Sequence, residues 1–351
     1  MIVRCDILFN FNLMNNIIYV FVAMIIDFIL GDPNWLPHPI IYIGKLISKI
    51  EKKFRDKYGN NEKLKRAGGV MVIIVCLVTY FIPYILLRFA LISRPIFHIL
   101  NVLIIWTTLA AKSLDKAAME VYYSLQKDDI DDARIKLSYI VGRDTTGLSK
   151  HEIIRADIET VAENASDGII APIFYALIGG APLAMMYKGV NTMDSMVGYL
   201  NEKYKNIGFF PAKVDDVFNF IPARLTGLLM CLCAFVVKGN IIKSFKIMIR
   251  DRKNHKSPNC AYPEAATAGA LKIQLGGTNV YFGEVVYKPT IGDNINELTE
   301  EHIKKSVKLM YASEVLLVLI MVIVLISIYA YMIYLIMELF RLKSKYVMNL
   351  F

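Results

Sequence analysis

The sequence predicts an all-α protein: a polytopic integral membrane helical bundle with cytoplasmic amphipathic helices and long loops that carry the polar motifs. Three observations lead to this prediction. Apolar residues make up 56% of the 351 residues, and charged residues only 20%. The apolar residues are concentrated in blocks, and a helix of roughly 20 such residues can cross a bilayer. The net charge of +9 favours anionic partners such as phospholipid headgroups, phosphates or carboxylates.

Four apolar blocks are expected to span the membrane. They lie at 13–31, 70–92, 95–111 and 313–339. A short turn joins the second block to the third, which predicts a helical hairpin. Asp27 interrupts the first block, and no small-residue cleavage site follows it, so this block is interpreted as a helix and not as a cleavable signal.

Two weaker apolar segments, 169–187 and 225–237, are expected to be re-entrant or buried in the bundle. The first contains two adjacent glycines and a proline, and the second is short for a span. The lysines and arginines of loop 44–69 place that loop in the cytoplasm by the positive-inside rule, and segment 112–168 returns to the same side. No linker divides the chain, so 1–351 is treated as a single polytopic unit.

The segments outside the apolar blocks are themselves helical in pattern. In residues 112–126 and 130–141, apolar and polar side chains recur with the period of an amphipathic helix. The chain has five cysteines and no CxxC pair, which argues against a disulfide framework or a zinc ribbon.

Segment 142–168 carries the densest polar pattern. Ser149 and Glu152 fit a capping box, so a helix should begin there. Glu159 and Glu163 then lie one turn apart on the same face, where like charges repel. This face is either solvated and laced with ion pairs, or it holds a divalent cation such as Mg²⁺ and an anion. Neither a P-loop nor a zinc-protease motif is complete here.

Segment 187–224 contains two polar clusters between apolar runs. They are Asn191, Asp194 and Ser195 in the first cluster, and Asp215, Asp216 and Asn219 in the second. Members of the second cluster share a helix face and could ligate one hard cation, or one aspartate could cap a helix while its neighbour faces solvent. Polar groups beside short apolar segments are costly at membrane depth and tend to mark function.

Segment 250–293 begins with basic residues. They are Arg250, Arg252, Lys253, His255 and Lys256. The cluster is either a patch that faces lipid headgroups or a phosphate-binding wall, in which His255 could act as acid, base or phosphate donor. A turn follows at 257–259, and Pro263 is expected to start a helix.

Four stretches carry a resemblance to a known family. They read DFILGDPNWLPHPIIYIGKLI, VGRDTTGLSKHEIIRADIETVAENASDGIIAPIFYALIGGAPLAMMYKGVNTMDSMVGY, DDVFNFIPARLTG and HKSPNCAYPEAATAGALKIQLGG. In this order, between about residues 24 and 293, the chain resembles the cobalamin-biosynthesis family CbiB, called CobD in the aerobic pathway. Gly189 and the pair Cys260 and Ala261 depart from the family pattern, but the charged motif positions are intact.

The resemblance implies a membrane carbon–nitrogen ligase, an adenosylcobinamide-phosphate synthase. Such an enzyme joins adenosylcobyric acid to (R)-1-amino-2-propanol O-phosphate, or to an aminopropanol or ethanolamine analogue, and uses ATP and Mg²⁺. Its site would face the cytoplasm from the cell membrane, where ATP is available. The implied partners are the corrinoid, the amino-alcohol phosphate and the lipid bilayer. A homo-oligomer and other corrinoid-pathway proteins are further candidates, and no nucleic acid is expected.

The resemblance also suggests roles for the polar residues, because three anionic reactants need cations and a metal to neutralise their charge. The catalytic candidates are Glu163, Asp194, His255 and Glu264. The candidate metal ligands are Glu159, Glu163, Asp167, Asp215 and Asp216. The candidate contacts to phosphate and other substrate groups are Asp32, His38, Arg143, Asp144, Arg155, Asn164, Lys188, Asn191, Ser195, Asn219, Arg224, Ser257 and Asn259.

Two rival functions use some of the same features. A membrane Mg²⁺-dependent prenyltransferase would also place aspartates and asparagines against a helical bundle, but two full aspartate-rich repeats are missing. A transporter for a corrinoid or another anion would be expected to show broken helices in two related halves, and the sequence shows no such duplication.

Overall fold

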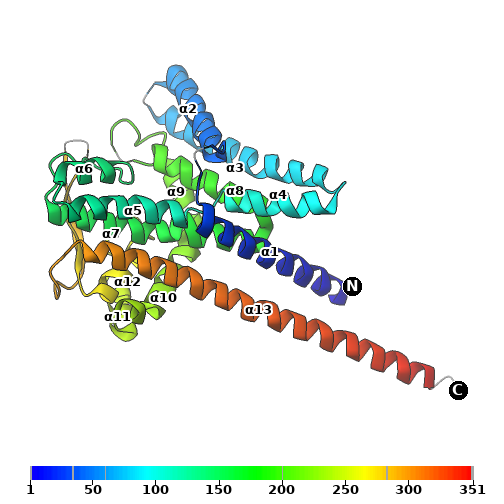
Figure 1. Cartoon of the computed structure of the whole chain (residues 1–351). Helices are drawn as coiled ribbons and strands as arrows, with labels where there is room; N and C mark the ends of the chain where they lie inside the picture. Colours follow the sequence, from blue (N-terminus) through cyan, green and yellow to red (C-terminus); the bar gives the residue numbers. More distant parts are fainter. Residues whose placement is uncertain (1, 34, 60, 200, 282–283, 349–351) are drawn as a thin grey trace.

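The fold is almost entirely helical. The computed structural model describes residues 2–33, 35–59, 61–199, 201–281 and 284–348, arranged as shown in Figure 1. The elements are α1 (Ile2–Leu30), α2 (Pro39–Tyr58), α3 (Glu62–Ala90), α4 (Arg94–Trp106), α5 (Ala111–Gln126), α6 (Ile130–Ser138), α7 (Lys150–Ala165), the π-helical turn η1 (Ser166–Ile170), α8 (Ala171–Val197), α9 (Phe209–Phe218), α10 (Phe220–Leu232), the 3-10 turn η2 (Ala234–Val237), α11 (Ile241–Asp251), α12 (Ala261–Leu271), β1 (Gln274–Tyr281), β2 (Glu284–Gly292) and α13 (Glu301–Met348). The prediction of an all-α fold is confirmed.

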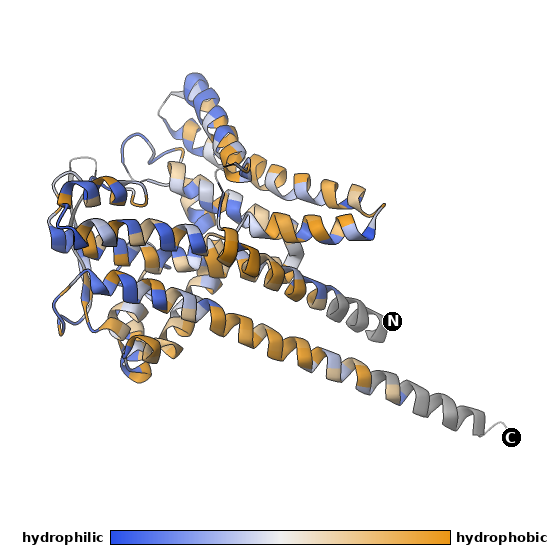
Figure 2. Ribbon diagram, in the orientation of Figure 1, coloured by the Kyte–Doolittle hydropathy of each residue, from blue (hydrophilic) through white to orange (hydrophobic). Residues whose placement is uncertain are grey.

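Five helical stretches are long and apolar enough to cross a membrane. They are Asn12–Leu30, Glu62–Ala90, Arg94–Gln126, Lys150–Val197 and Glu301–Tyr334. Figure 2 shows the hydrophobic parts of α1, α3, α4 and α13 extending to one side, away from the more hydrophilic α5 and α6. This arrangement fits a multi-pass membrane protein.

The helical hairpin of α3 and α4 forms as expected, but α4 is shorter than the apolar block 95–111. It ends at Trp106, where the hydroxyls of Thr107 and Thr108 donate hydrogen bonds to backbone carbonyls three residues earlier, at 2.8 and 2.6 Å. Such local bonds offer the backbone an alternative to continuing the helix. The chain therefore turns before α5 begins.

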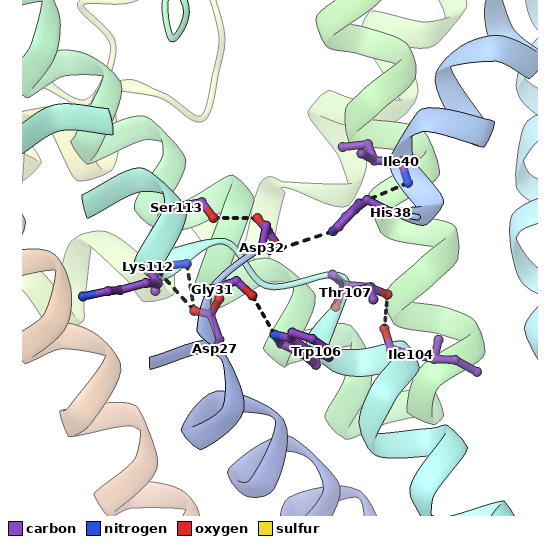
Figure 3. A network of polar contacts seen from close by, with 12 residues as sticks. Asp27, Gly31, Asp32, His38, Ile40, Ile104, Trp106, Thr107, Lys112 and Ser113 are labelled. Atoms are coloured by element: carbon purple, nitrogen blue, oxygen red, sulfur yellow. Dashed lines mark hydrogen bonds and ion pairs between the residues drawn. The ribbon is translucent and has the colours of Figure 1, made fainter. Parts of the chain in front are cut away.

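Asp27, the acidic residue inside the first apolar block, caps α5. Its Oδ2 accepts hydrogen bonds from the backbone N–H groups of Ala111, at 3.0 Å, and Lys112, at 3.3 Å (Figure 3). A carboxylate at a helix N-terminus satisfies free donors and interacts favourably with the helix dipole. The same side chain is fully buried, so its position in an apolar helix has a structural reason.

The helix α8 reverses direction at Gly179 and Gly180. The rings of Tyr175 and Tyr187 stack with centroids 5.1 Å apart, whereas in a straight helix these positions would be about 18 Å apart. Gly180 has φ +66°, a conformation that favours glycine. The amide of Asn16 donates to the carbonyl of Leu177 at 3.1 Å, beside the turn. Segment 169–187 thus has the shape of a re-entrant hairpin.

The helix α7 begins with the predicted capping box. The Ser149 hydroxyl accepts a hydrogen bond from the backbone N–H of Glu152, and the Glu152 carboxylate accepts one from the backbone N–H of Ser149. Almost every residue from Ile153 to Ala165 is buried, so α7 is a central helix of the fold. The burial of these side chains excludes a fully solvated face for this segment.

The antiparallel hairpin of β1 and β2 was not expected from the sequence. Its register pairs Gln274 with Gly292 and is irregular between Leu275 and Gly277. Gly276 and Gly277 both have positive φ, which lets the strand bend where it approaches α7. The candidate functional site described below depends on this contact between β1 and α7. A smaller difference is that α12 begins at Ala261, two residues before the expected proline.

Candidate functional site

A cavity of about 320 Å³ lies where α7, η1, the second half of α8, α9 and the loop before α12 meet. Nine residues singled out from the sequence line it. They are Glu163, Asp167, Asp194, Asp215, Asp216, Asn219, His255, Ser257 and Asn259. We call this the carboxylate cavity, because five of the nine are acidic. Segments nearly a hundred residues apart in the chain therefore share one hollow.

The reversal of α8 builds one wall of the carboxylate cavity. It returns Asn191 to the end of α7, where its amide donates to Oδ2 of Asp167 at 3.1 Å. It also returns Tyr187, whose hydroxyl donates to Oδ1 of Asn219 at 2.8 Å. The amide of Asn219 in turn donates to Oδ2 of Asp215 at 3.0 Å. Two asparagines thus orient two of the acidic side chains.

The acidic side chains outnumber the cations around them. Lys213 pairs with Asp216 at 3.3 Å, and Lys205 pairs with Glu202 outside the acidic group. Burial, with the nearby charge of Asp194, raises the pKa of Asp215 to about 8. In this environment a bound cation would favour the ionised form.

The donor set fits a hard divalent cation. Carboxylates and amide oxygens are the ligands that Mg²⁺ prefers. Among the described side chains, Oδ1 of Asp215 and Oγ of Ser166 are buried at the cavity without a hydrogen-bond partner. In the same part of the chain, no three acidic, histidine or cysteine side chains already surround one point. A Mg²⁺ ion at this place would therefore have to be held by one or two carboxylates together with water and substrate phosphates, which is its usual mode of binding.

The opposite wall comes from the loop before α12. Nδ1 of His255 accepts a hydrogen bond from the backbone N–H of Ser257 at 3.0 Å. Burial and the charge of Lys288 lower the pKa of His255, so its imidazole is neutral near pH 7. The Asn259 amide donates to the carbonyl of Asp216 at 2.8 Å and thereby fastens this loop to α9.

Arg224 holds Asn259, a residue of that wall, in position. It donates to Oδ1 of Asn259 at 3.3 Å, and its guanidinium lies over the rings of Phe220 and Tyr262, 3.5 and 4.3 Å from their centroids. Stacking and hydrogen bonding of this kind use the planar guanidinium fully. Arg224 thus positions Asn259 and does not itself line the carboxylate cavity.

A second, smaller cavity of about 90 Å³ adjoins the first. It is lined by Arg143, Glu159, Glu163, Asn164 and Glu264 among others, so Glu163 borders both cavities. Burial, followed by the charge of Glu159, raises the pKa of Glu264 well above its usual range. The surroundings of Glu264 therefore favour its protonated form, and in that form the carboxyl group can donate a hydrogen bond.

Glu159 differs from the other candidate metal ligands. Its Oε2 lies 2.5 Å from Nη2 of Arg143, its Oε1 accepts from the backbone N–H of Gly276 at 2.9 Å, and Arg155 is 3.9 Å away. All of these groups are buried or nearly so. The protein itself balances the charge of Glu159 with Arg143 and Arg155, and Arg143 also lines the smaller cavity. The metal and phosphate contacts expected of these three residues stay predictions.

Asp32 and His38 also lie outside the carboxylate cavity. They pair with each other at 3.3 Å, and the hydroxyl of Ser113 donates to Asp32 at 2.6 Å (Figure 3). His38 caps α2 by accepting from the N–H of Ile40. These bonds join the end of α1 to α2 and α5, which gives the pair a structural role, and its contact with substrate stays a prediction.

Three further candidates do not line either cavity. Asp144 is exposed and accepts from the backbone and hydroxyl of Thr146. Ser195 donates to the carbonyl of Thr192 at 2.9 Å. Lys188 is buried and interacts electrostatically with Asp32 and with Asp167. Lys188 is therefore within electrostatic range of both Asp32 and the acidic cluster, and it is not among the residues that line the carboxylate cavity.

Several lining residues were missed by the sequence reasoning. Lys205, Lys213 and Tyr199 lie on the α8–α9 connection and the start of α9. The spacing of Lys213 and Asp216 on one helix could have indicated Lys213, because residues three apart are about one turn apart. Cys260 also lines the cavity, and its thiol donates to Oε1 of Glu163 at 3.0 Å. Only the tertiary structure reveals that contact.

Comparisons with known proteins agree with the resemblance in the sequence. The family model described as CobD/Cbib protein matches residues 20–310. The chain is 63% identical over 304 residues to a "Cobalamin biosynthesis protein CobD" of Clostridium tetani, covering 87% of this chain and 96% of the relative. It is 48% identical over 296 residues to a "Cobalamin biosynthesis protein CbiB" of Salmonella typhi, covering 84% and 93%.

No solved structure matches the chain. The family match covers every segment that lines the carboxylate cavity, from α7 to the loop before α12. The sequence resemblance is thereby confirmed: the chain belongs to the CobD/CbiB family.

Proposed function

We propose that this protein acts in cobalamin biosynthesis as a membrane-bound carbon–nitrogen ligase. Its reaction joins a propionate carboxylate of adenosylcobyric acid to the amine of (R)-1-amino-2-propanol O-phosphate, or of an aminopropanol or ethanolamine analogue. ATP supplies the energy, and the product is adenosylcobinamide phosphate. The names of its relatives support the pathway. The ligase chemistry rests on the site.

The observation that carries the proposal is the carboxylate cavity itself. One hollow collects acidic side chains for Mg²⁺, lysines for phosphate and a neutral histidine. Lys205, Lys213 and Lys256 line it together with the acidic group. These are the groups that an ATP-dependent condensation of two anions requires, because mutual repulsion otherwise opposes their approach.

The size of the carboxylate cavity limits what enters it. About 320 Å³ is at the lower end of ligand pockets. A corrin macrocycle exceeds this space, so the ring would rest outside while one propionate arm reaches inward. This arrangement suits a reaction at the tip of a side arm, where the rest of the corrinoid supplies binding energy.

The condensation can be written in two steps. The propionate oxygen attacks the γ-phosphorus of ATP, ADP leaves, and an acyl phosphate forms. The amine then attacks the acyl carbon, the amide forms and phosphate leaves. Mg²⁺, when bound by Asp215, Asp216 or Glu163, neutralises phosphate charge. His255 can take the proton that the attacking ammonium must lose only after its Nδ1 releases the backbone N–H of Ser257, because a neutral ring whose Nδ1 accepts carries its hydrogen on Nε2. A carboxylate of the cavity is the other candidate base.

The location follows from the same requirements. ATP is cytoplasmic, so we place the carboxylate cavity on the cytoplasmic side of the cell membrane. The hairpin of α8 is consistent with this, because a reversal at Gly180 returns Asn191 and Asp194 to the side of Asp167. Cysteine labelling of 201–208 from outside intact cells should then be weak, and strong labelling would contradict the placement.

One assay tests the function directly. Purified protein in nanodiscs is given adenosylcobyric acid, aminopropanol phosphate and ATP with Mg²⁺, and the amide is detected by mass spectrometry. We expect product and ADP only when all components are present. Release of pyrophosphate from an isoprenyl donor would support the prenyltransferase instead. Corrinoid uptake by vesicles without amide formation would support the transporter.

A further inference from the structure

An apolar groove of about 480 Å³ lies between the start of α2 and the middle of α3, and it shares no lining residue with the carboxylate cavity. Pro39, Tyr42 and Leu46 form one side of it, and Val78, Ile82 and Leu86 form the other. Of the two hydroxyl-bearing residues that line it, Tyr42 and Thr79, Thr79 already donates a 2.7 Å hydrogen bond to the carbonyl of Val75. The groove therefore offers hydrocarbon contact and almost no free polar group.

The groove opens sideways from an apolar helix. Tyr42, Ile82 and Leu86 remain 60%, 56% and 50% exposed, although α3 is one of the helices apolar enough to span a membrane. Side chains exposed on such a helix meet lipid, not water. Pro83 lies inside α3 at this level and cannot donate a backbone hydrogen bond. A linear hydrocarbon chain is the ligand that matches this shape and surroundings.

Positive charge stands at one end of the groove. The helix α2 continues from it with five exposed lysines: Lys45, Lys49, Lys52, Lys53 and Lys57. Its other face packs Ile43 and Ile47 into the core, so the lysines point outward. Among the described residues, none of the five lies within ion-pair distance of a carboxylate. Figure 2 shows the hydrophilic far part of α2 beyond the hydrophobic stretch of α3.

We propose that this groove and the adjoining lysines bind one anionic diacyl phospholipid. An acyl chain occupies the groove, and the phosphate group lies against Lys45 and Lys49, which follow Tyr42 and Leu46 by one turn. A zwitterionic lipid would gain the apolar contact without net charge attraction. A second copy of this chain fits poorly, because a symmetric contact would oppose five lysines to five lysines.

The site has a consequence for the fold. Met185, on the returning half of α8, forms part of the groove's inner wall, one turn before the buried Lys188. A bound chain would therefore press the hairpin of α2 and α3 against the half of α8 that carries Asn191 and Asp194. Lipid occupancy should raise the melting temperature of the protein, since a ligand that binds only the folded state stabilises it.

The test measures which lipid stays with the protein. Full-length protein is equilibrated in nanodiscs of equal parts phosphatidylglycerol and phosphatidylcholine, released, and examined by native mass spectrometry. We expect one retained phosphatidylglycerol. Lys45→Gln with Lys49→Gln should lower its enrichment by roughly 25-fold at low salt, about fivefold for each lysine. Ile82→Trp, which fills the groove, should reduce retention of both lipids.

A matched variant separates the groove from general surface charge. Lys127→Gln with Lys150→Gln removes the same charge from the ends of α5 and α7 and should leave retention unchanged. Equal retention in the wild type and all variants would overturn the proposal. So would equal retention of the two lipids by the wild type, or a dimer that Ile82→Trp dissolves. Melting temperatures and circular dichroism of each variant show that it is folded.

Discussion

Glu159 and Glu163 lie one turn apart on α7, but the charges that surround them are opposite in sign. Glu159 meets the guanidinium of Arg143 at 2.5 Å and a backbone N–H from β1. Glu163 faces a cavity shared with Asp167 and other carboxylates, where the thiol of Cys260 donates a hydrogen bond to it. A carboxylate that the protein balances with its own cation serves the fold. A carboxylate that lies among other carboxylates favours the binding of a cation from solution.

The largest effect should come from neutralising carboxylates that line the carboxylate cavity. Glu163→Gln and Asp216→Asn keep shape and remove a charge from the carboxylate cavity. If they hold a magnesium nucleotide, each should lower amide formation by about 10²–10³-fold, as loss of transition-state charge stabilisation does. The measurement is turnover of adenosylcobyric acid with saturating Mg²⁺, together with the amount of protein in the membrane.

Glu202→Gln is the matched control for these two variants. Glu202 is exposed and pairs with Lys205 outside the acidic group, so its loss should leave turnover within a factor of two or so of the wild type. Near-normal turnover in both Glu163→Gln and Asp216→Asn would contradict the assignment of these residues to metal binding. It would also remove the proposed difference in role between Glu159 and Glu163.

Separating Glu159 from Arg143 should lower the stability of the protein. Arg143→Met leaves the carboxylate of Glu159 buried without its closest cation, which should cost about 3 kcal/mol of unfolding free energy. Adding Glu159→Leu removes the stranded charge and should recover much of that loss. Thermal unfolding in nanodiscs measures both. A double variant less stable than Arg143→Met would show that Glu159 contributes through its other contacts, chiefly that to Gly276.

A smaller effect is expected where a neutral side chain orients an acidic one. Asn191→Ala removes the amide that donates to Asp167 at 3.1 Å. Loss of such a supporting bond typically weakens metal binding by about tenfold or more. Activity titrated with Mg²⁺ after EDTA treatment should therefore shift to higher concentration. Ser195→Ala, four residues along the same helix, removes a hydroxyl that donates to the carbonyl of Thr192, and it should leave the titration unchanged.

The helices could be predicted because their signals are local. Apolar blocks mark the long helices, and Ser149 with Glu152 marks the start of α7 to the residue. The carboxylate cavity was anticipated only as a set of residue types. That Asp167 meets Asn191 depends on the reversal at Gly180, and sequence periodicity does not report where a helix turns back.

The contrast between Glu159 and Glu163 was beyond sequence reasoning for a similar reason. Helical spacing places both on one face, so both were expected to bind a metal. The difference arises from Arg143 in the preceding loop and from Gly276 in an unexpected strand. Tertiary contacts from other segments decide the role of each charge, and a single helix carries no information about them.

The smallest effect concerns the helix that carries both glutamates. Ser149→Ala removes the hydroxyl of the capping box at the start of α7, which should cost about 1 kcal/mol of stability. Because this cap lies more than two turns from either glutamate, their surroundings should persist, and the Mg²⁺ titration of activity should match the wild type. A lower melting temperature with an unchanged Mg²⁺ requirement would separate the stability of α7 from the function of its acidic face. A shifted Mg²⁺ requirement would instead show that the cap sets the position of Glu163, and the two properties would then be coupled through the helix.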